Sequence, residues 1–187
     1  VRQTAAGLNF IDVYHRIGLY KMPSMPGIIG NEGAGVVEAV GDGVTEVAVG
    51  DRVAYCMSLG SYTQRRCIAA RLLVKLPDGI SDEQAAAVLL KGCTVQYLIR
   101  RTYPVKAGDT VLYHAAAGGC GLIACQWLKH LGVTVIGTVG TPEKAAFVLE
   151  ATFETIGQAL SETGRRAATV LDDLDIDDWF RAREPED

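Results

Sequence analysis

Between residues 110 and 140, two short apolar runs flank a glycine-rich stretch and a longer apolar run, and this pattern predicts a strand–helix–strand unit. Residues 111–113 form a short apolar run that leads into a glycine-rich stretch. The apolar run Leu122–Leu128 then indicates a helix, which is expected to end at Gly132. A second strand is expected over Val133–Gly137. Two strands joined by a helix are typical of a parallel βαβ unit.

Short strands separated by glycine turns are predicted before this unit. The pattern indicates one strand over Val1–Asn9 and another in the alternation that follows Gly35. Three more segments indicate a turn and a strand or a strand alone: Gly50–Tyr55, Gly60–Arg65 and Leu72–Pro77. Short strands with this spacing favour a small β-barrel.

Helices are predicted on either side of the βαβ unit. Ser81 and Gln84 have the spacing of a capping box, and an apolar helix is expected from there to about Arg100. A further helix is expected after Pro142, with apolar residues spaced for one buried face as far as Leu160.

Composition excludes several classes of protein. A chain of 187 residues that is 49% hydrophobic has room for one ordinary domain or two small ones. A net charge of −4 argues against non-specific nucleic-acid binding. No apolar run approaches the ~20 residues that cross a membrane, and no signal peptide opens the sequence. The five cysteines show no CxxC pairing, which favours a reducing, cytoplasmic location.

The charge divides the chain near residue 150. Residues 151–187 carry ten acidic and four basic side chains, whereas residues 1–150 carry twelve acidic and fourteen basic ones. We therefore expect 151–187 to be a separate helical and acidic tail.

The glycine-rich stretch carries the clearest chemical signal. Aligned with the pattern G-x-G-x-x-G, Ala116 takes the first glycine position, while Gly118 and Gly121 hold the other two. Between a strand and a helix, this pattern is typical of a turn that holds a dinucleotide pyrophosphate against backbone N–H groups. A purely structural βαβ turn without a ligand is the alternative.

The end of the second strand indicates which nucleotide the turn would hold. NAD sites usually place an acidic residue there, about 20 residues beyond the glycines, and the stretch 137–142 has none. Thr141 is expected to cap a helix that starts at Pro142, with Lys144 in its first turn. A cation there suits a 2′-phosphate and favours NADPH over NADH. An ordinary solvated lysine is the alternative, and the neighbouring Glu143 weakens the preference.

Seven segments in order carry a resemblance to a known family: Gly7–Tyr14, Gly18–Tyr20, Gly30–Gly35, Gly50–Val53, Leu90–Thr94, His114–Gly121 and Gly137–Thr141. On these residues the chain resembles the zinc-independent quinone oxidoreductases, the zeta-crystallin-like group of the medium-chain dehydrogenase/reductase superfamily. The match extends from residue 1 to about 149. Relative to that family, the chain is expected to be truncated at both ends.

The resemblance implies an α/β fold in which a GroES-like β-barrel domain stands beside an incomplete Rossmann domain with a parallel sheet. The active site would lie in the cleft between them. The implied division is a catalytic domain over 1–90, shortened at its start, a partial NADPH-binding Rossmann domain over 91–150, and the unrelated tail over 151–187.

The resemblance also implies that the site holds no zinc. Zinc-dependent relatives have a histidine where this chain has Asn31 and a cysteine where it has Asn9. A catalytic zinc needs about three cysteine, histidine or carboxylate ligands. Without a metal, the implied reaction is the transfer of a hydride or electrons from NADPH to a quinone.

Specific residues take roles by the same resemblance. Asn9, Tyr14 and Tyr20 are candidates for lining the quinone side of the site. The expected cofactor-binding residues fall into three groups: Phe10, Ile11, Asp12, Val13, Tyr14 and Thr94 near the nicotinamide; Ala116, Ala117, Gly118 and Gly119 around the pyrophosphate; and Gly140 and Lys144 at the adenosine end.

Several of these residues also have a structural interpretation. Asp12 could cap a turn or pair with Arg16, Asn9 could satisfy backbone groups, and the two tyrosines could be core aromatics with a hydrogen-bonded tip. Three hypotheses for the whole chain therefore remain open: an NADPH-dependent quinone reductase, a catalytically inactive relative that binds NADPH weakly, and an interaction protein. The family's homodimer is a further expectation, although the half that forms it lies outside the match.

Overall fold

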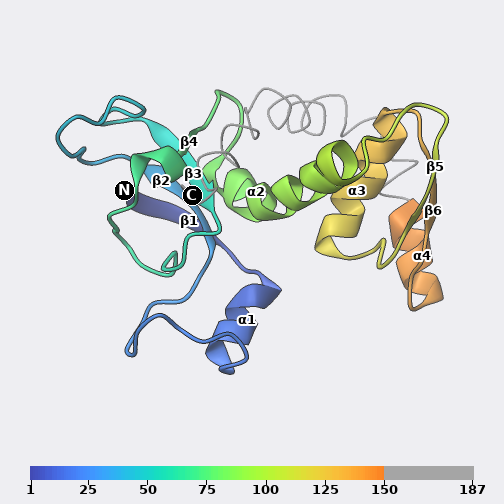
Figure 1. The fold of residues 1–187 in the computed structure, drawn as a ribbon, viewed down its shortest axis with the longest axis horizontal. Helices are drawn as coiled ribbons and strands as arrows, with labels where there is room; N and C mark the ends of the chain where they lie inside the picture. The colour runs from blue at the N-terminus through green and yellow to red at the C-terminus, as the bar shows by residue number, and fades with distance from the viewer. Residues whose placement is uncertain (150–187) are drawn as a thin grey trace. The chain divides into compact units, whose positions relative to one another are not determined.

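The computed structural model describes residues 1–149, which divide into two compact units. The first unit is Val1–Leu90 and the second begins at Lys91. The boundary falls inside helix α2 (Asp82–Tyr97), drawn in green in Figure 1. The predicted tail over 151–187 and the predicted helical stretch that reaches Leu160 lie outside the described residues.

The first unit is built on a four-stranded antiparallel sheet with the order β1-β2-β3-β4. Its strands are β1 (Arg2–Gly7), β2 (Glu32–Val36), β3 (Arg52–Cys56) and β4 (Val74–Lys75). Helix α1 (Phe10–Arg16) follows β1, and a 3₁₀ turn, η1 (Ala70–Leu72), precedes β4. A small core of Val37, Val47 and Val53 packs beside the sheet.

The strand predictions for this unit are partly confirmed. A strand at the start of the chain and one after Gly50 are present. Strand β2 ends at Val36, so the prediction of a strand after Gly35 is wrong. Residues 31–35 are all buried, and a strand buried on both faces shows no apolar–polar alternation. The segment 60–65 forms only an isolated bridge between Arg65 and Arg2.

The second unit contains the predicted βαβ unit. Strands β5 (Thr110–Tyr113) and β6 (Thr134–Gly137) pair in parallel, with Leu112 opposite Ile136. Helix α3 (Gly119–His130) joins them, and helix α4 (Pro142–Leu149) follows β6. A π-helical turn, η2 (Leu98–Thr102), extends α2 close to the predicted helix end. Four fully or almost fully buried side chains, Ala124, Cys125, Trp127 and Leu128, lie on α3.

No helix within residues 1–149 combines the length and the apolar character needed to cross a bilayer.

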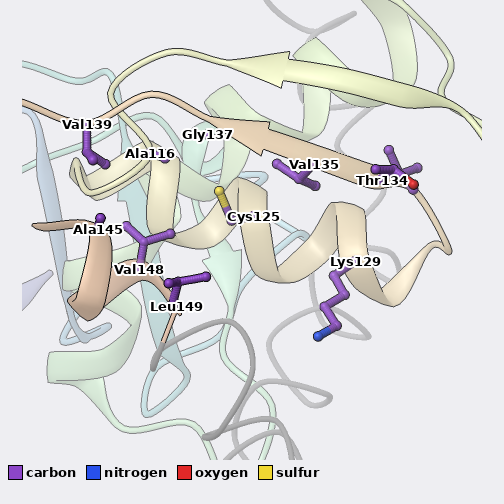
Figure 2. A pocket seen from close by; sticks show the side chains of 11 residues that line it. Ala116, Cys125, Lys129, Thr134, Val135, Gly137, Val139, Ala145, Val148 and Leu149 are labelled. Carbon is purple, nitrogen blue, oxygen red and sulfur yellow. The ribbon is translucent and has the colours of Figure 1, made fainter. Parts of the chain in front are cut away.

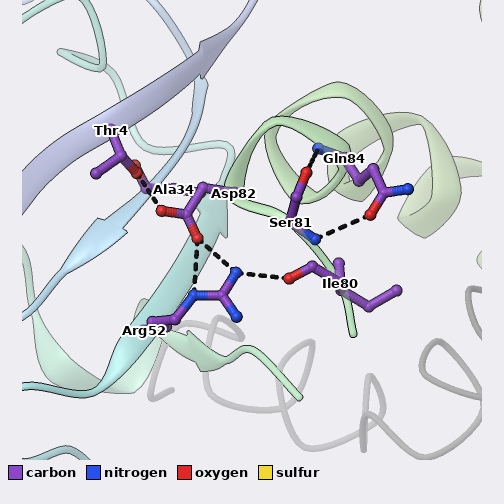
Figure 3. Close-up of polar contacts among 7 residues, drawn as sticks. All are labelled: Thr4, Ala34, Arg52, Ile80, Ser81, Asp82 and Gln84. Atoms are coloured by element: carbon purple, nitrogen blue, oxygen red, sulfur yellow. Dashed lines mark hydrogen bonds and ion pairs between the residues drawn. The ribbon is translucent and has the colours of Figure 1, made fainter. Parts of the chain in front are cut away.

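Polar contacts fix the start of α2 in the first unit, as Figure 3 shows. Ser81 and Gln84 form the predicted capping box: the Gln84 N–H donates to Ser81 Oγ at 3.2 Å, and the Ser81 N–H donates to Gln84 Oε1 at 2.9 Å. Asp82 accepts hydrogen bonds from Thr4 on β1 and from Arg52 on β3, whose Nη2 lies 2.7 Å from Asp82 Oδ1. Arg52 also donates to the carbonyl of Ile80. The Asp82 carboxylate thus links strands β1 and β3 to the start of α2.

These contacts make the stability of the first unit depend on pH. Partial burial opposes ionisation of Asp82, but hydrogen bonds from Thr4 and Arg52 prevail and hold its pKa below the usual value. The folded state therefore favours the ionised carboxylate. That contribution is fully present above the unfolded pKa of about 4, and it is lost as pH falls through the lower pKa of the folded state.

We expect Asp82→Asn to lower the free energy of unfolding most at neutral pH, with the loss shrinking as the solution is acidified towards pH 3. Urea unfolding of the wild type and the variant at several pH values in this range measures the difference in their free energies of unfolding. Asp78→Asn, at an exposed position four residues earlier, is the matched control and should show no such trend. A loss that stays constant with pH would contradict the role given to Asp82.

Candidate functional site

A buried carboxylate, Asp12, organises the start of α1 in the first unit. Its side chain is 2% exposed and accepts hydrogen bonds from three donors. These donors are the N–H of Asn9 at 3.0 Å, Asn31 Nδ2 at 2.9 Å and the hydroxyl of Tyr62 at 2.9 Å. The Asp12 N–H in turn donates to the carbonyl of Asn9 at 3.0 Å. Asn9 is the N-cap of α1, and Asp12 stabilises this helix start by accepting the hydrogen bond from the Asn9 N–H.

A second buried carboxylate, Glu32, ties the same helix start to α2. Glu32 is fully buried on β2. Its Oε2 accepts a hydrogen bond from Asn9 Nδ2 at 2.7 Å, and its Oε1 accepts one from the Leu90 N–H at 2.7 Å. Asn9 is thus held from both sides, by Asp12 at its backbone and by Glu32 at its side chain.

Tyr62 completes this network from a loop 50 residues further along the chain. Hydrogen bonds from the N–H groups of Gly60 and Ser61 to the carbonyl of Gly30 hold that loop in place. Burial, reinforced by the hydrogen bond to Asp12 and the charges of Asp12 and Glu32, raises the pKa of Tyr62 to about 12. The hydroxyl is therefore protonated at neutral pH and acts as a donor.

We expect Tyr62→Phe to lower the free energy of unfolding by about 1–3 kcal/mol, because a buried carboxylate loses a donor. Urea unfolding at neutral pH measures the loss. Tyr103→Phe is the control, since Tyr103 is 61% exposed. Equal unfolding midpoints for the two variants would contradict the role of Tyr62.

The predicted aromatic residues of this unit gather on and beside α1. Tyr14 and Tyr20 meet edge to face with their ring centroids 5.3 Å apart, and Phe10 lies 6.4 Å from Tyr14 between centroids. Phe10 is 79% exposed and Tyr20 is 47% exposed. These rings are therefore not core aromatics but form an exposed aromatic surface. Ile11 and Val13, on the same helix, are half-buried.

The glycine-rich turn of the second unit is pinned to the end of β6. The Ala116 N–H donates to the carbonyl of Thr138 at 3.0 Å, and the Ala115 N–H donates to Thr138 Oγ1 at 3.3 Å. His114 Nδ1 also lies 3.1 Å from that hydroxyl. Ala115 takes the left-handed conformation, with φ of 54°. Thr138 thus fixes the shape of the turn through three of its residues.

This arrangement divides the four residues predicted around the pyrophosphate into two pairs. The N–H of Ala116 is used by Thr138, and the N–H of Gly118 donates to the carbonyl of Ala115 at 2.8 Å. The N–H groups of Ala117 and Gly119 have no hydrogen-bond partner within residues 1–149. Gly118 and Gly119 are exposed at the start of α3. Unpaired N–H groups at a helix start are the donors that an anion needs.

Gly121 lets α3 approach this turn closely. A Cβ at Gly121 would lie 2.5 Å from the carbonyl oxygen of Ala116 and closer still to that of Ala115. Both contacts involve backbone atoms, so the turn itself would have to move. The third glycine of the motif is therefore explained by packing between helix and turn.

We expect Gly121→Ala to destabilise the second unit by about 1–3 kcal/mol, as overpacking does in well-packed interiors. Thermal or urea unfolding checks this. Gly41→Ala provides the control, because nothing lies within 4 Å of a Cβ added there. Unchanged stability of the Gly121 variant would show that the turn tolerates a side chain.

The start of α4 follows the sequence prediction. Pro142 is its first residue, and Thr141 caps it by accepting a hydrogen bond from the Lys144 N–H at 3.3 Å. Gly140 and Lys144 are both exposed there. Hydrogen bonds from its own N–H and from Thr141 hold the pKa of Glu143 below its usual value. A positive and a negative side chain therefore stand next to each other at this helix start.

A pocket of about 440 Å³ lies behind the turn, among α3, β6 and α4 (Figure 2). Ala116 is fully buried, and its side chain faces this pocket rather than solvent. The pocket is mostly apolar, and its other lining residues are Cys125, Lys129, Val133, Thr134, Val135, Gly137, Val139, Ala145, Val148 and Leu149. Ala116 thus contributes packing beneath the turn.

The remaining predictions concern Thr94 and the metal. Thr94 lies half-buried on α2 in the second unit. In the part of the chain that the structure describes, no group of three histidine, cysteine or acidic side chains could hold a metal ion. The positions of Asn9 and Asn31, compared with zinc ligands above, are occupied by amides bonded to Glu32 and Asp12. The absence of zinc stays a prediction.

Sequence reasoning missed two contributors to these sites. Tyr62 was not singled out, since no local pattern links it to Asp12 across 50 residues. The Thr138 side chain was also missed as the anchor of the turn, although its place at the end of β6 beside the glycine motif is a signal that could have found it.

Comparison with known proteins shows which proteins share this sequence and fold. The alcohol dehydrogenase GroES-like domain matches residues 1–78. A GroES-like domain followed by a parallel βαβ unit with a glycine-rich turn defines a medium-chain dehydrogenase/reductase. The chain is homologous to quinone oxidoreductases of that superfamily, as the following similarities show.

Over 174 residues the chain is 55% identical to a quinone oxidoreductase of Pseudomonas aeruginosa, a match that covers 92% of this chain and 54% of that protein. A solved quinone oxidoreductase of Pseudomonas syringae is 58% identical with a TM-score of 0.78, covering 81% of this chain and 47% of that one. The Escherichia coli quinone oxidoreductase solved in complex with NADPH is 53% identical, with the same TM-score of 0.78 and the same coverage, 81% and 47%. The chain thus spans about half the length of the relatives it matches.

Proposed function

We propose that this protein transfers reducing equivalents from NADPH to a quinone. The observation that carries the proposal is a pair of N–H groups at the start of α3, on Ala117 and Gly119, that have no hydrogen-bond partner within residues 1–149. They belong to a chain that is 53% identical to a quinone oxidoreductase solved in complex with NADPH. Donors in this position suit the pyrophosphate of a dinucleotide.

The second unit would hold the pyrophosphate and adenosine parts of the cofactor. Ala117 and Gly119 would donate their N–H groups to the pyrophosphate, while Ala116 and Gly118 shape the turn through bonds of their own. Gly140 and Lys144 would take the adenosine end. Thr94 would join Phe10–Tyr14 of the first unit near the nicotinamide, as the resemblance implies.

The first unit would contribute the quinone side. Tyr14 and Tyr20 offer partly exposed ring faces, which suit a flat aromatic acceptor. Asn9 is nine-tenths buried, and its side chain is oriented by Glu32, so we assign it a fixed polar contact beside these rings. Bound NADPH supplies a hydride that, together with a proton from solvent, converts the quinone to a hydroquinone and leaves NADP⁺. The residues of the chain bind and orient the two molecules.

The preference for NADPH over NADH would depend on the start of α4. The exposed ammonium of Lys144 is suited to a 2′-phosphate. The neighbouring carboxylate of Glu143 is negatively charged at neutral pH and opposes the same phosphate. Lys144 must therefore outweigh Glu143 if the chain is to prefer NADPH.

We expect Lys144→Ala to weaken NADPH binding about tenfold, the size of one charge-assisted contact, and to leave NADH binding nearly unchanged. Isothermal titration calorimetry with both nucleotides measures the two affinities. Lys106→Ala removes an exposed lysine elsewhere in the second unit and is the control. Equal losses for NADPH and NADH would remove the 2′-phosphate argument.

The proposed function itself is tested on the wild-type chain. We expect micromolar NADPH binding by calorimetry and, with 1,4-benzoquinone present, a catalysed loss of NADPH absorbance. Binding without turnover would contradict the reductase activity and leave only the nucleotide site. The absence of binding would contradict the site as well.

A further inference from the structure

Lys91 lies against the start of α3 in the second unit. It belongs to α2, and its side chain is half-buried. A Cβ built on Gly119 would lie 3.0 Å from both Cδ and Cε of Lys91. The methylene stem of Lys91 therefore passes along the backbone of the first residue of α3, in the space that a Gly119 side chain would need.

This position sets a positive charge beside the glycine-rich turn. The ammonium Nζ is bonded to Cε, one of the two Lys91 carbons that lie 3.0 Å from the Cβ position of Gly119. The start of a helix already carries a partial positive charge from its aligned peptide dipoles. A cation next to a helix start is unfavourable by itself, and both become favourable when an anion binds between them.

We propose that Lys91 is a further cofactor-binding residue whose ammonium neutralises the pyrophosphate held at the start of α3. The inference rests on the proposed function, because it takes a dinucleotide as the anion. It also gives Gly119 a second role: the missing side chain leaves room for the stem of Lys91.

The two lysines would then divide the charges of the cofactor between them. Lys91 would act on the pyrophosphate, which NADPH and NADH share, whereas Lys144 would act on the 2′-phosphate, which only NADPH carries. The inference therefore predicts that loss of the Lys91 charge weakens the binding of both dinucleotides, whereas loss of the Lys144 charge weakens that of NADPH alone.

The test compares Lys91→Met, which keeps the stem and removes the charge, with Lys91→Arg, which keeps a charge. Lys129→Met, at the other end of α3, is the control for net charge. The probes are NADPH, NADH and adenosine 2′-monophosphate, which has no pyrophosphate. Calorimetry at two or more salt concentrations gives each affinity and its salt dependence, and circular dichroism checks that each variant is folded.

We expect Lys91→Met to weaken the binding of NADPH and of NADH by the same factor of about ten. The affinity of the variant for both dinucleotides should depend less on salt than that of the wild type. Its affinity for adenosine 2′-monophosphate should be unchanged. Lys91→Arg should recover most of the affinity. Wild-type affinities and salt dependence in Lys91→Met would overturn the inference while leaving the proposed function intact. An equal loss for adenosine 2′-monophosphate would overturn it too, by pointing to structural damage. A wild-type chain that bound neither dinucleotide would overturn both.

Discussion

The need to satisfy two buried carboxylates shapes the first unit. Asp12 and Glu32 are almost inaccessible to solvent, and a buried charge is tolerated only when hydrogen bonds replace its lost hydration. Their donors come from the start of α1, the residue before β2, the loop at Tyr62 and the backbone of α2. Segments far apart in the sequence are thereby held in one arrangement around Asn9.

These buried hydrogen bonds hold α1 in place without any contribution from its exposed side. Because the helix start is fixed from inside, Phe10, Tyr14 and Tyr20 can remain at the surface without the helix depending on their burial. Rigid polar support behind an exposed aromatic surface suits the proposed quinone site, because a preorganised site need not be ordered each time a ligand binds. Amide and carboxylate side chains provide this support.

In the second unit, backbone contacts rather than buried carboxylates fix the candidate site. Its turn is fixed by Thr138 from the end of the neighbouring strand and by the close approach of α3 at Gly121. Hydrogen bonds of the turn use the N–H groups of Ala115, Ala116 and Gly118, whereas those of Ala117 and Gly119 have no partner within residues 1–149. Local strain at Ala115, with φ of 54°, is compatible with this because the surrounding hydrogen bonds over-determine the turn.

The sequence by itself determined the elements whose signals are local. The βαβ unit, the caps at Ser81 and Thr141 and the glycine-rich turn depend on neighbouring residues, and all are present as predicted. Only the tertiary structure decided where β2 lies, because a strand of small residues buried on both faces has no alternation to read. It also decided that Tyr62 serves Asp12, that Thr138 holds the turn and that Lys91 lies beside Gly119. These contacts join residues that lie 22 or more positions apart in the sequence, and only the folded chain brings such pairs together.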